Sequence, residues 1–346
     1  MVDGKNIANT PPVETEGASR EKLEEVTLLR CFAVLTLVVH HVLCIYLADS
    51  WGGIDCPMNG YFKKIFGWFI PEANMPLFTF IAGYLMGYQV ECKKYDTFMV
   101  FARKKVHRLL IPYLILGALM VVLQPGIPGG WNGMIYGVPN HMWYCLMLFY
   151  CYTLFYLISN FSKEWVNALV AMGSLALNMK YGSMWTIYQN FHLIGGIELP
   201  LYFYFWFWLG SYIFKHRQEF FSITNAMLLL TVYLLARPHA QAIFKSIAYI
   251  LVLLQITYWL VHVTKWPEWV HKLFGSIAMC SFGIYVFHHL FLWDATHIDI
   301  FSQYILPLCS EHYVLMPIVL TIVAFAMSWG ITALLLNTKT GKYLLA

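Results

Sequence analysis

Residues 27–48 read TLLRCFAVLTLVVHHVLCIYLA, an apolar run in which Arg30, His40 and His41 are the only basic side chains. A helix of about 20 mainly apolar residues can cross the hydrocarbon core of a membrane, so this run predicts a transmembrane helix. The composition agrees, because 60% of the 346 residues are apolar and only 12% are charged. A soluble domain carries about 25% charged residues. Most of the surface of this protein must therefore face lipid.

The same criterion selects ten segments, separated by turn signals such as the Pro- and Gly-rich stretch 124–130. They predict an all-α, polytopic membrane bundle with about ten transmembrane helices. The fifth segment is the weakest of the ten because it is short. The expected spans are residues 27–48, 66–90, 106–123, 142–160, 165–180, 197–214, 220–236, 242–262, 273–293 and 313–336.

The distribution of lysine and arginine tests this count, since cytoplasmic loops carry an excess of basic residues. With the N-terminus inside and ten spans, 17 of the 22 basic residues fall in inner segments and 5 in outer ones. An error of one helix early in the count would invert that bias. The pattern therefore favours ten spans with both termini in the cytoplasm. The five outer residues are Lys63, Lys64, Lys180, Arg237 and Lys245.

Residues 1–22 are polar and lack the apolar core of a signal peptide, so they predict a disordered cytoplasmic tail. Residues 23–346 form one membrane domain. The eight cysteines show no metal-ligand spacing, which predicts no metal, although Cys56 and Cys309 both fall in expected outer loops, where they could pair. A net charge of +4 gives no indication of nucleic-acid binding.

Arg30 and His41 lie eleven residues apart in the first span. At ~100° per residue this is three turns plus ~20°, so both point to one face, separated by a rise of ~16 Å. If Arg30 lies at the inner boundary, His41 lies near the middle of the membrane, where an ionisable side chain normally faces a cavity or a partner. We interpret the pair as functional. His40 points elsewhere and is interpreted as packing or as support for His41.

Two further polar groups break the apolar pattern. Ser281, Tyr285 and His288 recur at i, i+4 and i+7 and form a polar stripe that must face the bundle interior. This stripe fits hydrogen bonding between helices as well as a functional role. A basic cluster precedes the third span on its cytoplasmic side. It either orients the helix against anionic lipid or binds phosphates. Its members are Arg103, Lys104, Lys105 and Arg108.

Five segments, in order, resemble the acyltransferase-3 family of membrane-bound acyltransferases. They are the Arg30–His41 spacing, Pro76-Leu77-Phe78 with Gly83-Tyr84, the basic cluster followed by Ile111-Pro112-Tyr113, His141-Met142-Trp143-Tyr144, and Ser281 with Tyr285 and His288. The chain departs from the family pattern at Ala82, where a serine is usual. Pro76 should kink the second span, and Gly83 and Gly87 should allow close helix packing.

The resemblance implies an acyl-coenzyme A donor, usually acetyl-coenzyme A, and a hydroxyl acceptor, usually on a sugar or polysaccharide precursor. His41 would be the catalytic base, and Arg30 with the basic cluster would hold the donor's phosphates. Glu72, Trp143 and Tyr144 become candidates for the acceptor site, and Ser281, Tyr285 and His288 for support of His41 or contact with the acceptor. The family is mostly bacterial, which implies a multi-pass protein of the inner or plasma membrane. This chain looks like a version without an added extracytoplasmic hydrolase-like domain.

Other functions stay open at this stage. A transporter or flippase for a lipid-linked sugar or a small solute could use His41, Glu72, Glu198 and His288 along a path. A non-catalytic scaffold does not explain polar stripes inside two helices. The sequence shows no Gly-x-Ser-x-Gly motif, so it gives no sign of serine-hydrolase chemistry. It does not separate direct transfer from a covalent acyl-histidine, and it leaves the acyl group, the acceptor and any homo-oligomer undetermined.

Overall fold

A computed structural model describes residues 23–46, 54, 56–58, 60–62, 64, 73–123, 130–137, 140–236, 241–292 and 301–345. Within these ranges every regular element is helical and none is a strand. The all-α class is therefore confirmed. The predicted tail, residues 1–22, and the candidate Glu72 lie outside the described residues.

A helix overlaps each of the ten expected spans, because each apolar run can satisfy its own backbone hydrogen bonds only as a helix. These helices are α1 (Glu24–Cys44), α3 (Asn74–Glu91), the continuous α4 (Phe98–Lys105), η1 (Val106–Leu110) and α5 (Ile111–Leu123), α7 (Trp143–Phe161), α8 (Glu164–Tyr181), α10 (Leu199–Lys215), α12 (Ile223–Ala236), α13 (Ala242–Val263), α14 (Glu268–Phe287) and α17 (Met316–Leu335). Short elements connect them: α6 (Gly130–Ile135), η2 (Asn140–Met142), α9 (Met184–Phe191), η3 (Ile194–Gly196), α11 (Arg217–Phe220), η4 (His288–Phe291), η5 (Phe301–Ile305), α16 (Leu306–Glu311) and α18 (Lys339–Leu345).

Six helical stretches among the described residues are individually long and apolar enough to cross a membrane. They are Glu24–Cys44, Phe98–Val122, Trp143–Phe161, Ala242–Val263, Glu268–Phe291 and Met316–Leu335. The apolar stretch Ile223–Leu235 is shorter, and α3, α8 and α10 do not meet the same criterion. The protein is thus a multi-pass membrane protein, while the count of ten spans and the cytoplasmic placement of both termini stay predictions.

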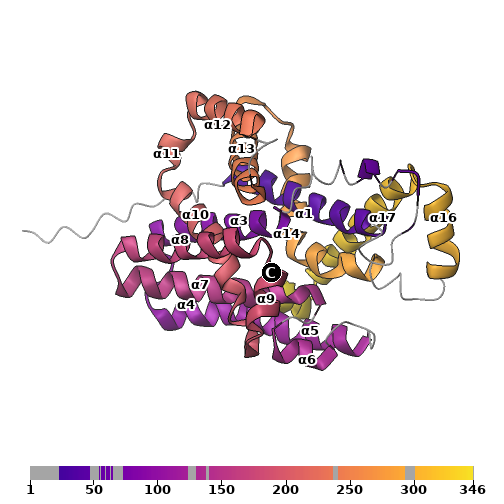
Figure 1. The fold of residues 1–346 in the computed structure, drawn as a ribbon, viewed down its shortest axis with the longest axis horizontal. Coiled ribbons are helices and arrows are strands. Elements are labelled where there is room, and N and C mark those ends of the chain that lie inside the picture. The colour runs from indigo at the N-terminus through magenta and orange to yellow at the C-terminus, as the bar shows by residue number, and fades with distance from the viewer. Residues whose placement is uncertain are drawn as a thin grey trace, which may run out of the picture.

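Helix α1 lies at the centre of the bundle. It packs against α14, α13, α17 and α3, and in Figure 1 it runs between the α3, α8 and α10 group on one side and α17 on the other. Its apolar side chains fill the interior, with Leu29, Ala33, Val34 and Leu37 almost completely buried. The polar side chains of this helix are therefore held against neighbouring helices.

Helices α3 and α10 cross at two glycines. A Cβ atom at Gly83 would overlap the backbone of Phe207, and one at Gly210 would overlap the backbone of Phe80. Only glycine permits backbones to approach this closely. Gly87 makes a looser contact, since its Cβ would lie 3.0 Å from the Phe214 ring. The predicted packing role of Gly83 and Gly87 is confirmed.

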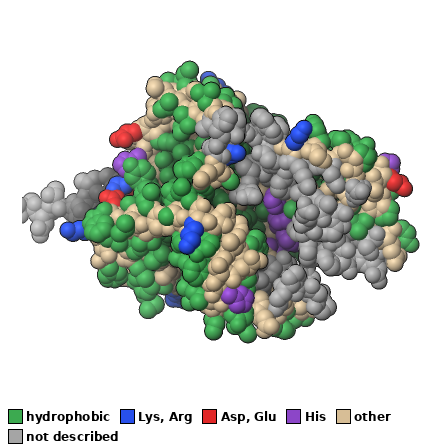
Figure 2. All heavy atoms as spheres, in the orientation of Figure 1, with side chains coloured by type: hydrophobic (Ala, Val, Ile, Leu, Met, Phe, Trp, Pro, Cys, Tyr) green, Lys and Arg blue, Asp and Glu red, His purple; other side chains and the backbone are tan. Residues whose placement is uncertain are grey.

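The outer surface is apolar where it is described. Helices α5, α12 and α17 expose rows of leucine, isoleucine, valine and methionine side chains. In Figure 2 hydrophobic side chains cover much of the visible face, and charged side chains are few. Such a surface is suited to contact with lipid hydrocarbon, because soluble proteins rarely expose so large an apolar area to water.

Two expectations about individual residues change. Pro76 lies in the first turn of α3, where its missing N–H leaves no hydrogen bond unmade, so the expected kink at this proline was wrong. Cys56 and Cys309 are both buried, and neither is part of a disulfide. Each lies close to the hydroxyl of Tyr46. The suggested disulfide between them is not formed in this structure.

Candidate functional site

Five histidines from three distant segments gather in the interior. His40 and His41 come from the end of α1, His141 from η2, and His288 and His289 from η4. The ring centroids of His41 and His288 lie 4.8 Å apart, and those of His41 and His289 lie 4.6 Å apart. His141 stacks on His289 at 4.0 Å. The predicted residues His41 and His288 are thus neighbours, within a larger cluster of histidines.

The hydrogen bonds fix the tautomers of two of these rings. His288 Nδ1 lies 3.0 Å from the Ile284 carbonyl oxygen, which can only accept, so Nδ1 carries the proton and Nε2 the lone pair. His41 Nδ1 lies 3.1 Å from the Leu37 carbonyl and 2.9 Å from His288 Nε2, both acceptors. His41 therefore carries its proton on Nδ1 and its lone pair on Nε2. A neutral His41 in this tautomer presents a basic Nε2.

The polar stripe on α14 faces other parts of the site. Arg30 Nη2 donates to Ser281 Oγ at 2.8 Å. The Tyr285 hydroxyl donates to the backbone carbonyl of His141, and His288 meets His41 as described above. The structure thus brings the three stripe residues together with both predicted catalytic residues. Whether they serve catalysis or helix packing stays a prediction.

The predicted donor-binding residues line one cavity of about 540 Å³. Burial raises the pKa of Tyr95, with the nearby charge of Arg108 acting in the opposite direction. The phenol therefore stays protonated at neutral pH and donates to Gln89 Oε1 at 2.6 Å. We call this space the basic pocket. Its lining residues are Gln89, Lys94, Tyr95, Val100, Arg103, Lys104, Lys105, His107 and Arg108.

Lys105 is the buried member of the basic pocket, 5% exposed. Its ammonium lies 3.4 Å from the centroid of the Tyr152 ring and 3.4 Å from Gln89 Oε1. This cation–π contact stabilises the charge inside the protein. Directly after Lys105 the chain forms the π-helical turn η1, an arrangement common at functional sites. Lys105 lies one turn after the buried Phe101 on α4, so both side chains point inward, whereas Arg108 within the wider turn is exposed.

Arg30 connects the basic pocket with the histidine cluster. It lies close enough to Arg108 for the two charges to repel, and the Tyr152 hydroxyl is near both guanidinium groups. On its other side Arg30 bonds Ser281, one turn before Tyr285 on α14 and two turns before His288, where η4 begins. A series of polar groups therefore lies between the basic pocket and the histidines.

The acceptor candidates have mixed outcomes. Trp143 and Tyr144 are both buried. Tyr144 faces the stripe, with its ring 5.8 Å from that of Tyr285, whereas Trp143 packs 5.4 Å from Phe203 on α10. Glu72 lies outside the described residues. Tyr144 is thus close to the site, while Trp143 packs within an aromatic layer.

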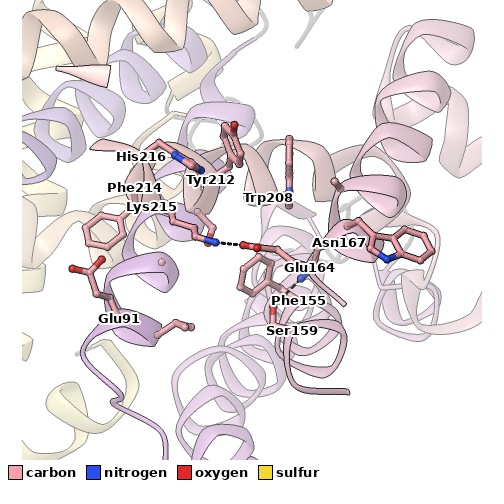
Figure 3. Close-up of a pocket in the computed structure, with 15 residues that line it drawn as sticks. Glu91, Phe155, Ser159, Glu164, Asn167, Trp208, Tyr212, Phe214, Lys215 and His216 are labelled. Atoms are coloured by element: carbon pink, nitrogen blue, oxygen red, sulfur yellow. Dashed lines mark hydrogen bonds and ion pairs between the residues drawn. The ribbon is translucent and has the colours of Figure 1, made fainter. Parts of the chain in front are cut away.

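A second cavity, of about 750 Å³, lies between α3, α7, α8 and α10 (Figure 3). Its polar rim includes an ion pair between Lys215 and Glu164 and a 2.8 Å hydrogen bond from Asn167 Nδ2 to Ser159 Oγ. Apart from these groups its lining is largely aromatic and aliphatic. None of the predicted site residues lines this cavity.

The periodicity of the sequence gives no indication of His289 and little indication of the part that His40 and His141 have in the cluster. In a regular α-helix His289 would point ~100° away from His288. Instead α14 ends at Phe287 and the 3-10 turn η4 begins at His288, which brings both rings into the cluster. His141 was noted only as part of a motif, yet its Nε2 bonds the Val286 carbonyl at 3.1 Å. The sequence feature that could have indicated the cluster is the repeated pair of adjacent histidines, His40-His41 and His288-His289.

A family model for an acyltransferase domain matches residues 23–336, nearly the whole chain. No curated protein and no solved structure matches the chain. The matched range contains the Arg30–His41 helix, the basic pocket and the polar stripe of α14. The chain therefore belongs to the acyltransferase-3 family of membrane acyltransferases.

Proposed function

We propose that the protein transfers an acyl group from acyl-coenzyme A to a hydroxyl group of a sugar or polysaccharide precursor. Acetyl is the acyl group that we expect, from acetyl-coenzyme A. The observation that carries the proposal is the series of polar groups from the basic pocket, through Arg30 and Ser281, to the His41–His288 pair. One end of this path can bind phosphates and the other end holds a general base. This arrangement suits acyl-coenzyme A, a long donor with phosphates at one end and the thioester at the other.

The basic pocket supports the donor half of the proposal. Coenzyme A carries a diphosphate and a 3′-phosphate, which bind best to several converging cations. Arg103, Lys104 and Arg108 expose their charges at this pocket, and Lys105 lies at its buried side. A volume of about 540 Å³ is in the range of small-molecule sites. We therefore assign the phosphates to this pocket, on the predicted cytoplasmic side.

The separation between Arg30 and His41 supports the reach of the donor. Eleven residues of α-helix rise ~16 Å, which suits the extended pantetheine arm between the phosphates and the thioester. Arg30 is held by Ser281 on the route. With the phosphates in the basic pocket, the thioester arrives beside His41. A cytoplasmic donor then meets an acceptor that enters from the opposite side of the membrane.

The tautomer of His41 supports the chemistry. A sugar hydroxyl is a weak nucleophile and needs a base as it attacks a thioester. In direct transfer the hydroxyl proton passes to His41 Nε2, the oxygen bonds the acyl carbon, and the carbon–sulfur bond breaks. The coenzyme A thiolate then takes the proton from His41. In the covalent route His41 Nε2 attacks the acyl carbon, the carbon–sulfur bond breaks and the coenzyme A thiolate leaves. The acceptor hydroxyl then attacks the acyl-histidine, its proton passes to the thiolate, and the carbon–nitrogen bond breaks to restore neutral His41.

Substitution of Arg108 tests the donor site. We expect Arg108→Ala to weaken binding of acetyl-coenzyme A by about tenfold or more, since one charge-assisted hydrogen bond contributes roughly 1.5–3 kcal/mol. The rate at saturating donor should change less. The matched control is Lys272→Ala, an exposed cation paired with Glu268 outside the pocket. Titration with radiolabelled acetyl-coenzyme A in detergent gives the affinities.

Two outcomes of that titration would contradict the donor assignment. The first outcome is that Arg108→Ala binds acetyl-coenzyme A with the affinity of wild type. The second is that Lys272→Ala loses as much affinity for acetyl-coenzyme A as Arg108→Ala does. The second result would mean that the donor responds only to overall charge. Saturable binding that depends on Arg108 would instead justify a search through sugar acceptors.

A further inference from the structure

The histidine cluster has the chemistry of a metal site as well as that of a base. His41, His288 and His289 each offer a ring nitrogen, and these three atoms lie within 4.8 Å of one another. Among the described residues no other group of three or more histidine, cysteine, aspartate or glutamate side chains meets the same condition. No spacing in the sequence shows it, because the ligands come from α1 and η4, 247 residues apart.

The donor set is that of a zinc-class ion. Three neutral imidazoles with an open fourth position are a well-known coordination shell for divalent zinc, and imidazole also suits copper and nickel. Zinc–nitrogen bonds of about 2.0–2.1 Å at tetrahedral angles place the ligand atoms roughly 3.4 Å apart. Here the three ring nitrogens lie within 4.8 Å of one another. Ring rotations within the cluster can reach the required spacing.

The surroundings already orient two of the ligands. A metal-binding histidine normally donates its other ring N–H to a backbone carbonyl or carboxylate, which fixes the ring and its tautomer. His288 does this through Nδ1 to Ile284, and His41 through Nδ1 to Leu37. Both rings therefore carry the lone pair on Nε2. Without an ion the lone pair of His288 accepts the hydrogen bond from His41 Nδ1, and a bound ion replaces that hydrogen bond. No proton has to leave when an ion binds.

The three candidate ligands differ in how deeply they are buried. His288 is 0% exposed and His289 is 4% exposed, whereas His41 is only partly buried. His141 stacks on His289 and supports its ring. An ion can approach from the side of His41, and its fourth position would stay on that side. This is also the side on which the base needs access to the hydroxyl.

We propose that His41, His288 and His289 form a binding site for a divalent transition-metal ion of the zinc class. The bound ion occupies the lone pair of His41 Nε2, so it competes with proton abstraction and inhibits acyl transfer. The binding site stands on the geometry alone, while the inhibition rests on the proposed function.

Zinc binding to the purified full-length protein in detergent tests the site without any activity. We expect one zinc ion per chain after dialysis, measured by elemental analysis, and visible absorption bands of a tetrahedral complex when cobalt replaces zinc. His289→Ala should weaken zinc binding at least about tenfold, since even indirect changes at zinc ligands cost that much. His289→Gln serves as a second variant, and a monodisperse profile in size-exclusion chromatography shows that each variant is folded.

The matched control is a double variant, His216→Ala with His271→Ala. Each of these histidines lies at the surface within 4.0 Å of a glutamate carboxylate, and such pairs also attract zinc. This variant should keep the bound ion and the cobalt spectrum. The proposed metal site is wrong if wild type shows no saturable zinc binding. It is also wrong if the folded His289 variants keep the bound zinc, or if the surface variant loses the bound zinc.

Inhibition is measured separately. Zinc should slow acetyl transfer by wild type, and a chelator should restore the rate. An unchanged rate at zinc concentrations that fill the site would overturn the competition with His41. If wild type shows no transfer at all, the proposed function fails, yet the zinc stoichiometry and the cobalt spectrum still decide whether the metal site exists.

Discussion

At the scale of the residue, His288 positions His41. Its Nε2 accepts a hydrogen bond from His41 Nδ1 at 2.9 Å, and its own Nδ1 donates a hydrogen bond to the Ile284 carbonyl oxygen. This keeps the lone pair of His41 on Nε2, where a base needs it. In our account His288 acts through His41 and does not itself exchange protons with the acceptor.

Substitution of His288 separates positioning from packing. Gln places an acceptor oxygen near the position of Nε2, so His288→Gln should keep a substantial part of the turnover number, whereas His288→Leu should lose it by about 10²-fold or more. The Michaelis constant for acetyl-coenzyme A should change little in either variant, because the basic pocket is distant. Steady-state kinetics in detergent measures both. Equal losses in Gln and Leu would show that the hydrogen bond to His41 does not matter.

At the scale of the element, the bundle depends on the crossing of α3 and α10. A Cβ at Gly83 would overlap the Phe207 backbone, which cannot move aside as a flexible side chain can. We expect Gly83→Ala to lower the stability of the detergent-solubilised protein by about 1–3 kcal/mol, the usual cost of overpacking. Thermal unfolding followed by size-exclusion chromatography measures the change.

The control for this prediction is Gly173→Ala in α8. Gly173 has open space where a Cβ would stand, so alanine there should be neutral or stabilise the helix by about 0.5–1 kcal/mol. If both variants melt at the wild-type temperature, the close approach of α3 and α10 is not present in the protein.

Most of the elements could be predicted from the sequence, and several contacts of the site could not. Runs of about 20 apolar residues identify helices because a membrane leaves the backbone no other partner. The stripe of Ser281, Tyr285 and His288 could be predicted for the same reason, since polar side chains on an apolar helix turn inward. The inward position of His289 depends on the 3-10 turn η4, and Arg108 lies in the π-helical turn η1. Both turns change the register and leave no periodic signal.

At the scale of the whole molecule, the number of crossings decides which side carries the basic pocket. Helix α3 is not apolar enough to count as a span by itself, yet the ten-span arrangement needs it to cross. Cys92 directly follows α3 and is the exposed cysteine among the eight. With the N-terminus inside, ten spans place Cys92 in the cytoplasm, whereas the six stretches alone would place it outside.

Labelling of Cys92 with a membrane-impermeant maleimide distinguishes these arrangements. We expect no labelling in intact cells and labelling in inside-out vesicles. Cys92→Ser should abolish the signal, and Lys180→Cys in that background should label from outside, which verifies access of the reagent. Labelling of Cys92 in intact cells would mean that α3 does not cross and that the basic pocket faces away from cytoplasmic acyl-coenzyme A.

The proposed function depends most on His41, which we assign as the base, or the acyl carrier, in transfer from acyl-coenzyme A. The most direct measurement is the loss of the acetyl group from radiolabelled acetyl-coenzyme A, by wild type and His41→Ala side by side in detergent. His262→Ala, an exposed histidine on α13, is the control. We expect slow turnover by wild type and by the control, and a loss of about 10²–10⁴-fold in His41→Ala with donor binding retained. Equal turnover by wild type and His41→Ala would contradict it.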